Sequence, residues 1–365
     1  MRLPLDLRWR RGLLWLVIFL AAGLLGGALF ILSGIYNVSA SVRHFLITEK
    51  IINFTLDRSI AFHSDDDQPE NVHTDGMARL GARHFELGCA PCHGRPEDPP
   101  NPVALKMYPA PPDLAARVDA REDTELAWIV ENGLKFTGMP AWTGEGRGDE
   151  VWPLVAFLRR LPGMTAPDYA RLAGRTRTSA MDEATRCIAC HGDAEAPPIA
   201  PMVPNLSGQS QPYLERALLE YRRGVRQSGM MEPIAAEMSD ESIKRLSRYF
   251  ASQPAPAPSE GADTDTELGK EIAHSGIPQK QIPACLSCHG EAASPSFPKL
   301  AGLSADYITQ QLALFRSGKR SGTAYSSIMA MIAARLTPEQ MDQAARYLSG
   351  PIAEKGTPQI TEARP

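Results

Sequence analysis

All six cysteines of this 365-residue chain lie in three copies of one five-residue motif, Cys-x-x-Cys-His. The copies occupy residues 89–93, 187–191 and 285–289 and recur at nearly even intervals. A pair of thiols followed at once by a histidine, three times over, leaves few chemistries open to the chain. The even spacing also implies three domains, each built around its own copy of the motif.

The motif is typical of covalent attachment of c-type haem. The thioether bonds would fall on the six cysteines: Cys89, Cys92, Cys187, Cys190, Cys285 and Cys288. The proximal iron ligands would be the three histidines: His93, His191 and His289. A thioredoxin-like pair opens a helix in a βαβ unit, and no strand pattern surrounds any copy. A zinc site needs four ligands and each cluster offers three. We therefore expect three covalently bound c-type haems.

Net charge and cysteine usage limit which partners the chain can bind and in which cellular compartment it functions. The net charge of −4, with residues of both signs interspersed, argues against a nucleic-acid partner. Covalent haem attachment through paired thiols belongs to the periplasm or an equivalent exported space. We therefore expect the haem-bearing part of the chain to lie on the periplasmic side of a bacterial inner membrane.

The N-terminus predicts a membrane anchor. An uncharged stretch runs from Gly12 to about Val42, and a spanning helix needs roughly 20 such residues. Four arginines precede it and place residues 1–11 in the cytoplasm by the positive-inside rule: Arg2, Arg8, Arg10 and Arg11. We assign residues 12–40 to a single transmembrane anchor. The competing prediction is a long signal peptide cut after Ala40.

Residues 41–72 are expected to form a juxtamembrane helix and a linker. Apolar residues recur at helical spacing from Val42 to Ile60, and the acidic run at 65–67 ends the pattern. Three interpretations stay open for this helix. It lies in the membrane interface, it docks on a membrane partner, or it simply continues the anchor helix.

The rest of the chain predicts an all-α fold, because no run of alternating strand pattern is convincing. We place three tandem domains at 73–163, 170–253 and 265–352, with a proline-rich linker at 254–264 between the last two. In the first domain, Gly81 and Phe85 are expected on a short helix before the motif.

The second and third domains are repeats of each other. The segment 204–208, Pro-Asn-Leu-Ser-Gly, corresponds to 298–302, Pro-Lys-Leu-Ala-Gly, and the residues that follow keep the same spacing. Ser239 and Thr337 carry N-cap signals for the two final helices. The second domain has only about residues 180–186 before its motif, so its first helix is expected to be truncated or displaced.

An electron-transfer haem usually fills its sixth iron position, often with methionine, which raises the potential. In the first domain the best candidate is Met139, on a Gly-Met-Pro-Ala-Trp loop, with Met107 and Met164 as runners-up. The repeat alignment selects Met231 in the second domain and Met329 in the third. Their neighbours stay open as alternatives: Met230 and Met331.

Other residues are expected to support the haems. Each motif is followed by a Pro-x-Leu whose backbone carbonyl is placed to accept a hydrogen bond from the proximal histidine, beginning at Pro112, Pro204 and Pro298. Arg226 and Arg320 match between the repeats and are candidates for pairing with haem propionates. Five further histidines have no repeat partner and are interpreted as surface residues: His44, His63, His73, His84 and His274.

These residues and motifs, over roughly residues 74–350, resemble the class I cytochromes c. The last two domains look like the halves of the tandem dihaem cytochromes c, and the first looks like monohaem domains attached to bacterial respiratory complexes. The resemblance implies three helical haem domains with histidine–methionine ligation: His93 with Met139, His191 with Met231, and His289 with Met329.

The function expected from this resemblance is a membrane-anchored periplasmic relay of single electrons in a respiratory chain. Its leading partner is a haem-copper terminal oxidase, with the chain as donor or subunit. The alternative is a cytochrome subunit of a periplasmic dehydrogenase. A multihaem peroxidase is the enzyme alternative, and it would need one iron with an open distal position.

Overall fold

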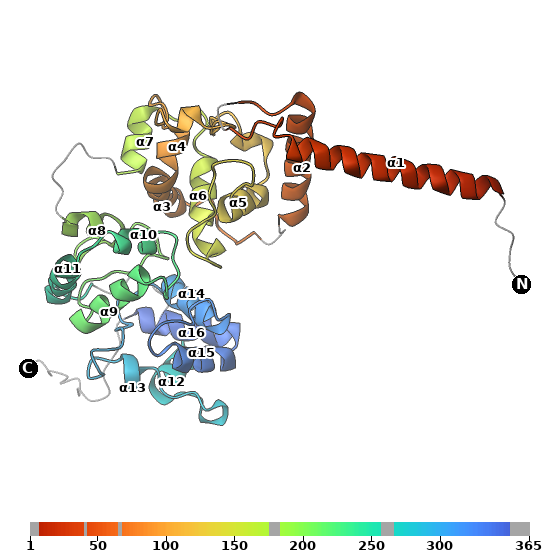
Figure 1. Ribbon diagram of the computed structural model, residues 1–365. Helices are drawn as coiled ribbons and strands as arrows, with labels where there is room; N and C mark the ends of the chain where they lie inside the picture. The colour runs from red at the N-terminus through yellow and green to blue at the C-terminus, as the bar shows by residue number, and fades with distance from the viewer. Residues whose placement is uncertain (1–6, 40–41, 65–67, 175–182, 257–265, 351–365) are drawn as a thin grey trace, which may run out of the picture.

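The computed structural model describes residues 7–39, 42–64, 68–174, 183–256 and 266–350, and every regular element within these ranges is helical (Figure 1). The α-helices are α1 (Leu7–Leu32), α2 (Leu46–His63), α3 (Asp75–His84), α4 (Ala90–His93), α5 (Asp123–Asn132), α6 (Trp152–Leu158), α7 (Ala166–Leu172), α8 (Glu183–His191), α9 (Gln211–Arg222), α10 (Met231–Ala236), α11 (Asp240–Ser252), α12 (Glu267–Ser275), α13 (Leu286–His289), α14 (Ala305–Arg316), α15 (Ser326–Arg335) and α16 (Pro338–Ser349). The shorter turns are η1 (Phe85–Cys89), η2 (Ala104–Lys106), η3 (Val118–Ala120), η4 (Gly148–Glu150) and η5 (Pro278–Lys280). The predicted all-α fold is confirmed.

Helix α1 stands apart from the rest of the protein. It projects from one edge of the fold, and none of its apolar window from Trp9 to Leu32 is buried (Figure 1). Its 24-residue window has a mean hydropathy of 2.5, so its length and composition suffice to cross a membrane. The helix ends at Leu32, earlier than the uncharged stretch does. The alternative cleavage position after Ala40 lies outside the described residues.

Helix α2 is a separate helix and does not continue α1. Residues 33–39 are not helical, and Tyr36 packs there against Phe30 and Phe45, with ring centroids 6.4 and 5.7 Å apart. The Tyr36 hydroxyl also hydrogen-bonds to Nδ1 of His44 at 2.6 Å. The interpretation of α2 as a continuation of the anchor is therefore wrong. The acidic run 65–67 lies outside the described residues.

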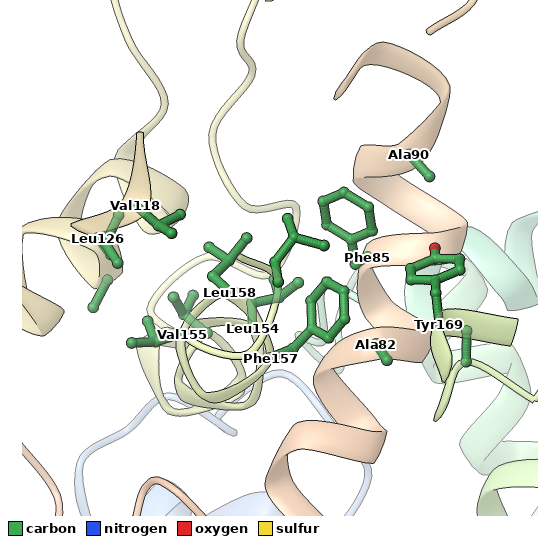
Figure 2. Packing of buried hydrophobic residues seen from close by; sticks show 14 residues of the cluster. Ala82, Phe85, Ala90, Val118, Leu126, Leu154, Val155, Phe157, Leu158 and Tyr169 are labelled. Atoms are coloured by element: carbon green, nitrogen blue, oxygen red, sulfur yellow. The ribbon is translucent and has the colours of Figure 1, made fainter. Parts of the chain in front are cut away.

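The first helical group, α3 to α7, is built on the crossing of α3 over α6. Gly81 permits the close approach, since a Cβ at this position would lie 1.8 Å from the backbone oxygen of Pro153. Around the crossing, Phe85, Phe157 and Tyr169 form an aromatic cluster with centroid separations of 5.1 to 6.3 Å (Figure 2). Gly81 lies on α3 as predicted, whereas Phe85 begins the π-helical turn η1 that leads into the motif.

Helix α2 packs on this first group through its inner face. Ile60 is only 1% exposed, and the ring of His63 stacks on Trp128 of α5 at 6.0 Å. Arg121 makes an ion pair with Asp57 of α2. The helix is therefore part of the folded body, and its opposite face remains in solvent.

The second group (α8 to α11) and the third group (α12 to α16) share one helix pattern. In each, a serine caps the first long helix after the Pro-x-Leu: Ser210 accepts from the Tyr213 amide and Ser304 from the Tyr307 amide. The final helices begin at the predicted caps, with the Ser239 and Thr337 hydroxyls accepting backbone N–H bonds. The repeat predicted from the sequence is therefore present in the local structure.

The two repeats face each other through reciprocal contacts. The Ser210 hydroxyl donates to the backbone oxygen of Pro295, and Ser304 donates to that of Pro201. Because these serines and prolines occupy matching repeat positions, the second and third groups are related by an approximate two-fold arrangement.

The second group lacks a separate helix before its motif in the part that is described. In the third group, Gly269 lets α12 cross α16, because a Cβ there would lie 2.1 Å from the Gln343 backbone oxygen. In the second group α8 begins at Glu183 and runs directly into the motif. Whether the helix before this motif is truncated or displaced stays a prediction, because it concerns residues before Glu183 that lie outside the described ranges. Residues 175–182 and most of the predicted linker, 257–265, lie outside the described residues.

Candidate haem-attachment sites

Each Cys-x-x-Cys-His motif ends a helix, so that its histidine occupies the last helical position. These helices are α4, α8 and α13. The chain then turns sharply. After His93, Gly94 has φ of +73° and a Cβ there would meet the Asp98 backbone oxygen at 2.9 Å, and Gly192 plays the same part after His191 with φ of +66°. After His289, by contrast, Gly290 has extended backbone, with φ of −80°.

The three motif histidines have equivalent hydrogen-bond partners, each the backbone carbonyl of the proline in its own Pro-x-Leu segment. Nδ1 of His93 donates to the carbonyl of Pro112 at 3.1 Å. Nδ1 of His191 and of His289 donate to Pro204 and Pro298, each at 2.8 Å. The predicted role of the Pro-x-Leu carbonyl is confirmed. This bond fixes each imidazole ring and leaves Nε2 as the nitrogen available to a metal.

Burial shifts the pKa of the three motif imidazoles and of two motif thiols, Cys89 and Cys285. It lowers the pKa of His93, His191 and His289, although the proline carbonyl opposes the shift in each case. It raises the pKa of Cys89 to about 12 and that of Cys285 to about 11. A neutral imidazole whose Nδ1 is bonded to a carbonyl is suited to bind a metal through Nε2.

In the first group, the loop that carries Met139 is held by its own backbone. The Thr137 hydroxyl donates to the Leu134 carbonyl at 2.7 Å and accepts from the Met139 amide at 3.0 Å. The Leu134 amide donates to the Met139 carbonyl at 3.3 Å. Met139 is half-buried. This loop presents the Met139 side chain from a fixed backbone, as a distal ligand requires.

The two runner-up methionines of the first group lie in different settings. The Met107 methyl reaches the Met139 loop, since a Cβ on Gly138 would lie 1.6 Å from it. Met164 packs against the hydrophobic core around Phe157. Met107 is therefore a neighbour of the Met139 loop, and Met164 is core filling.

In the second group, Met231 is the first residue of α10 and Met230 immediately precedes it. Both are half-buried, and the Met231 amide donates to the Ser228 hydroxyl at 3.1 Å. In the third group, Met329 packs against the same hydrophobic cluster as Cys285, whereas Met331 is 51% exposed. The structure thus places Met329 and Met331 in different environments, whereas it does not distinguish Met230 from Met231.

Two arginines are gathered at the boundary between the repeats. Arg226 is 4% exposed, stacks on Tyr221 at 4.6 Å and donates from Nη2 to the Tyr307 hydroxyl at 3.1 Å. Arg320 lies over Phe315 at 4.5 Å, and its buried Nε has no hydrogen-bond partner. Within the described ranges, neither guanidinium has an ion pair with a carboxylate. Two clustered cations without an anion fit the propionates of c-type haem.

One of the five histidines interpreted as surface residues is in fact buried. His84 is 6% exposed, its ring lies 5.8 Å from that of Trp142, and its Nδ1 has no partner. Burial lowers its pKa to about 4. The surface interpretation was wrong here because Trp142 and Glu150, from the segment before α6, pack against the last turn of α3. His63 and His73 are exposed, and His44 and His274 are half-buried.

Sequence reasoning also missed an acidic residue between the first and second groups. Glu150 bonds to Trp142 on its own group and to Ser228 and Gly229 on the next. Glu150 belongs to no sequence motif, and its position shortly after the Met139 loop is the one sequence feature that could have pointed to it.

Two family models match parts of the first and third groups, and several known proteins are similar to about half of the chain. Residues 76–158 match the family model described as cytochrome c oxidase, cbb3-type, subunit III, and residues 266–350 match that of cytochrome c. Cytochrome c-552 of Acidithiobacillus ferridurans is 39% identical over 171 residues, which cover 45% of this chain and 72% of that protein. The thiosulfate dehydrogenase electron acceptor of Stutzerimonas stutzeri is 31% identical over 213 residues, 57% of this chain and 98% of that protein. The solved Acidithiobacillus ferrooxidans cytochrome c4 is 36% identical over 46% of this chain and 98% of its own, with a TM-score of 0.42.

Proposed function

This chain belongs to the class I c-type cytochromes, and on that premise we propose that it binds three haems and passes single electrons from a periplasmic dehydrogenase into a membrane-bound respiratory chain. The observation that carries the proposal is the same histidine–proline carbonyl bond at all three motifs. A geometry repeated three times supports three equivalent metal sites.

In the proposed sites, each pair of motif cysteines would hold a haem by thioether bonds. His93, His191 and His289 would bind its iron through Nε2, and Met139, Met231 and Met329 are the proposed second protein ligands. When bound, the haem supplies a reversible one-electron couple. The protein holds the ligands in place and buries the site, and methionine opposite histidine raises the potential. A filled sixth position disfavours peroxide chemistry, so the peroxidase alternative has least support.

A dehydrogenase is the partner that the relatives favour. A protein named as a thiosulfate dehydrogenase electron acceptor aligns with this chain over 98% of its length, and a second, from Thiomonas intermedia, over 81%. Electron carriers of this family thus serve as acceptors for a periplasmic oxidation of a small sulfur anion. We propose the same class of donor here, in preference to a terminal oxidase.

A terminal-oxidase complex is the second candidate. The first group matches a family model described as an oxidase subunit, over residues 76–158. In that version the second and third groups receive electrons from a donor, and the first group delivers them to an oxidase. The two candidates are compatible with one chain that links donor to acceptor.

The proposed location is the outer face of a bacterial inner membrane, with α1 as anchor. The solvent-facing side of α2 carries an apolar stripe at helical spacing, Ile47, Ile51 and Phe54, which are 59–68% exposed. Lys50 and Arg58 are exposed on the same helix. In Figure 1, α1 extends from the edge of the first group that α2 forms. Apolar residues edged by cations suit the interface of an anionic bilayer.

Purification of the full chain from membranes tests the proposal. We expect three pyridine-haemochrome equivalents per chain, three low-spin electron spin resonance signals and rapid reduction by a co-purifying dehydrogenase. A Cys285→Ala/Cys288→Ala variant should keep two equivalents. Fewer than three equivalents in the wild type, or a stoichiometric high-spin signal, would contradict the proposed sites. Oxidase subunits that stay bound in place of a dehydrogenase would favour the second candidate.

A further inference from the structure

The first and second groups meet at an interlocked contact between two loops. Trp142 lies three residues after Met139, and its indole covers Gly229, where a Cβ would be 2.1 Å from Nε1 and Cε2. Gly144 approaches the same segment, with a Cβ position 2.6 Å from the Gly229 nitrogen. Since each loop fills the space that a side chain would take on the other, the contact requires glycine on both sides.

Glu150 joins the two loops. Its Oε2 accepts from the Trp142 indole at 3.2 Å and from the Gly229 amide at 2.6 Å. Its Oε1 accepts from the Ser228 hydroxyl at 2.7 Å. The Glu150 side chain is 13% exposed. Glu150 therefore holds the two loops in one arrangement, because it accepts hydrogen bonds from donors of both groups at once.

Arg147 forms ion pairs with both acidic residues of this contact. It is 7% exposed, lies 2.8 Å from Glu150 Oε1 and also pairs with Asp149. Its Nη1 donates to the backbone oxygen of Gln227 across the boundary at 2.6 Å. Asp149 in turn accepts from Gln310 of the third group at 2.5 Å. One arginine, two carboxylates and an amide from the third group are thus hydrogen-bonded to one another across the boundary.

The join also connects the two methionine loops. Ser228 donates to Glu150 and accepts from the Met231 amide, so one hydroxyl links the first group to the proposed ligand of the second. On the other side, Trp142 shares its loop with Met139. We propose that the contact of Trp142 with Gly229, held by Glu150, is the junction through which electrons pass between the first and second sites.

This inference rests on the proposed function and adds its internal route. The step moves one electron, which oxidises a ferrous iron in one group and reduces a ferric iron in the other, with no proton or ligand exchanged. The first group then exchanges electrons with the repeat pair through the methionine side of both sites. Trp142, Glu150 and Gly229 are positioning residues in this scheme.

The test uses the full chain in detergent, loaded with three haems and reduced by one electron with a pulse-generated radical. A Cys89→Ala/Cys92→Ala variant identifies the redistribution phase that involves the first site, because that phase disappears. We expect Glu150→Gln to slow this phase about tenfold or more, since losing the ion pair between Glu150 and buried Arg147 weakens the docked state by about 1.4 kcal/mol or more.

A steric pair makes the test specific to the contact. Gly229→Ala should slow the same phase, because its Cβ displaces the indole. Trp142→Phe removes the atoms it would strike, so the double variant should be less impaired than the sum of the singles. The matched control is Gly76→Ala at the same boundary, where a Cβ would meet the Ile199 oxygen at an ordinary 3.6 Å and should change nothing.

A second readout does not depend on electron transfer. The Gly229 amide donates to Glu150, so hydrogen exchange at residues 228–231 should rise in Glu150→Gln and Gly229→Ala and stay unchanged in Gly76→Ala. The inference is overturned if the first-site phase keeps its wild-type rate while exchange rises. It is equally overturned if both stay unchanged. A failure of the proposed function would appear earlier, as missing haem in the wild type.

Discussion

Arg226 of the second group donates a hydrogen bond from Nη2 to the Tyr307 hydroxyl of the third, 3.1 Å away. The matching Arg320 lies at the same boundary with a buried, unpaired Nε. Burial, together with the nearby charge of Arg226, lowers the pKa of Arg320. The boundary between the repeats therefore concentrates positive charge that an anionic group must offset.

Removing this charge should lower the potentials of the second and third sites. A cation near iron disfavours the ferric state, so Arg226→Gln and Arg320→Gln should each reduce a midpoint by on the order of 50 mV, where 59 mV is a tenfold change for one electron. Redox titration followed by absorbance would measure it. Arg245→Gln, which removes a surface partner of Glu183, serves as control and should leave all midpoints in place.

The distal ligand of the third site should be Met329. Met329→Ala should produce one high-spin signal and a midpoint lower by on the order of 100 mV, within the roughly 0.8 V range that axial ligands set. Electron spin resonance and redox titration measure both. Met331 is half exposed, so Met331→Ala should look like wild type, and the reverse pattern would reassign the ligand.

Acid should destabilise the first group through His84. Its folded pKa of about 4 lies below the ordinary histidine value of 6.5, so its neutral form is favoured by folding. Its contribution is complete above about pH 6.5 and is lost as the pH falls toward 4, to a total of about 3 kcal/mol. Denaturant titrations at several pH values should show a flatter profile for His84→Gln. His63→Gln, at an exposed ring, should keep the wild-type slope, and an unchanged slope in His84→Gln would refute the assignment.

The α3–α6 crossing should not tolerate a side chain at Gly81. Gly81→Ala should lower the free energy of unfolding by about 1–3 kcal/mol, because the helices must separate to admit the Cβ. Thermal denaturation would measure the loss. Gly88→Ala is the matched control, since a Cβ there meets nothing within 4 Å. Equal stability of the two variants would mean that the crossing relaxes freely.

Features encoded within a few residues could be predicted from the sequence. The caps at Ser239 and Thr337 and the proline carbonyls opposite the histidines depend on local chemistry, and the repeat fixes their spacing. Features set by distant packing could not. His84 is buried beside Trp142, and Glu150 gains its partners from residues about 80 positions away. The break between α1 and α2 was hidden because an uncharged stretch continues past Leu32.

The aromatic packing of Tyr36 against Phe30 and Phe45 limits how far the three helical groups, here called the body, can move from α1. The 13 residues from 33 to 45, fully extended, would reach at most about 45 Å. The contacts of Tyr36 with Phe30 and Phe45 hold the end of α1 closer to the start of α2 than that. If α1 spans the bilayer, the body stays close to the lipid surface and cannot range freely through the periplasm. Encounters with a membrane-bound acceptor then become a lateral, two-dimensional search, and a soluble donor must come to the membrane to be oxidised.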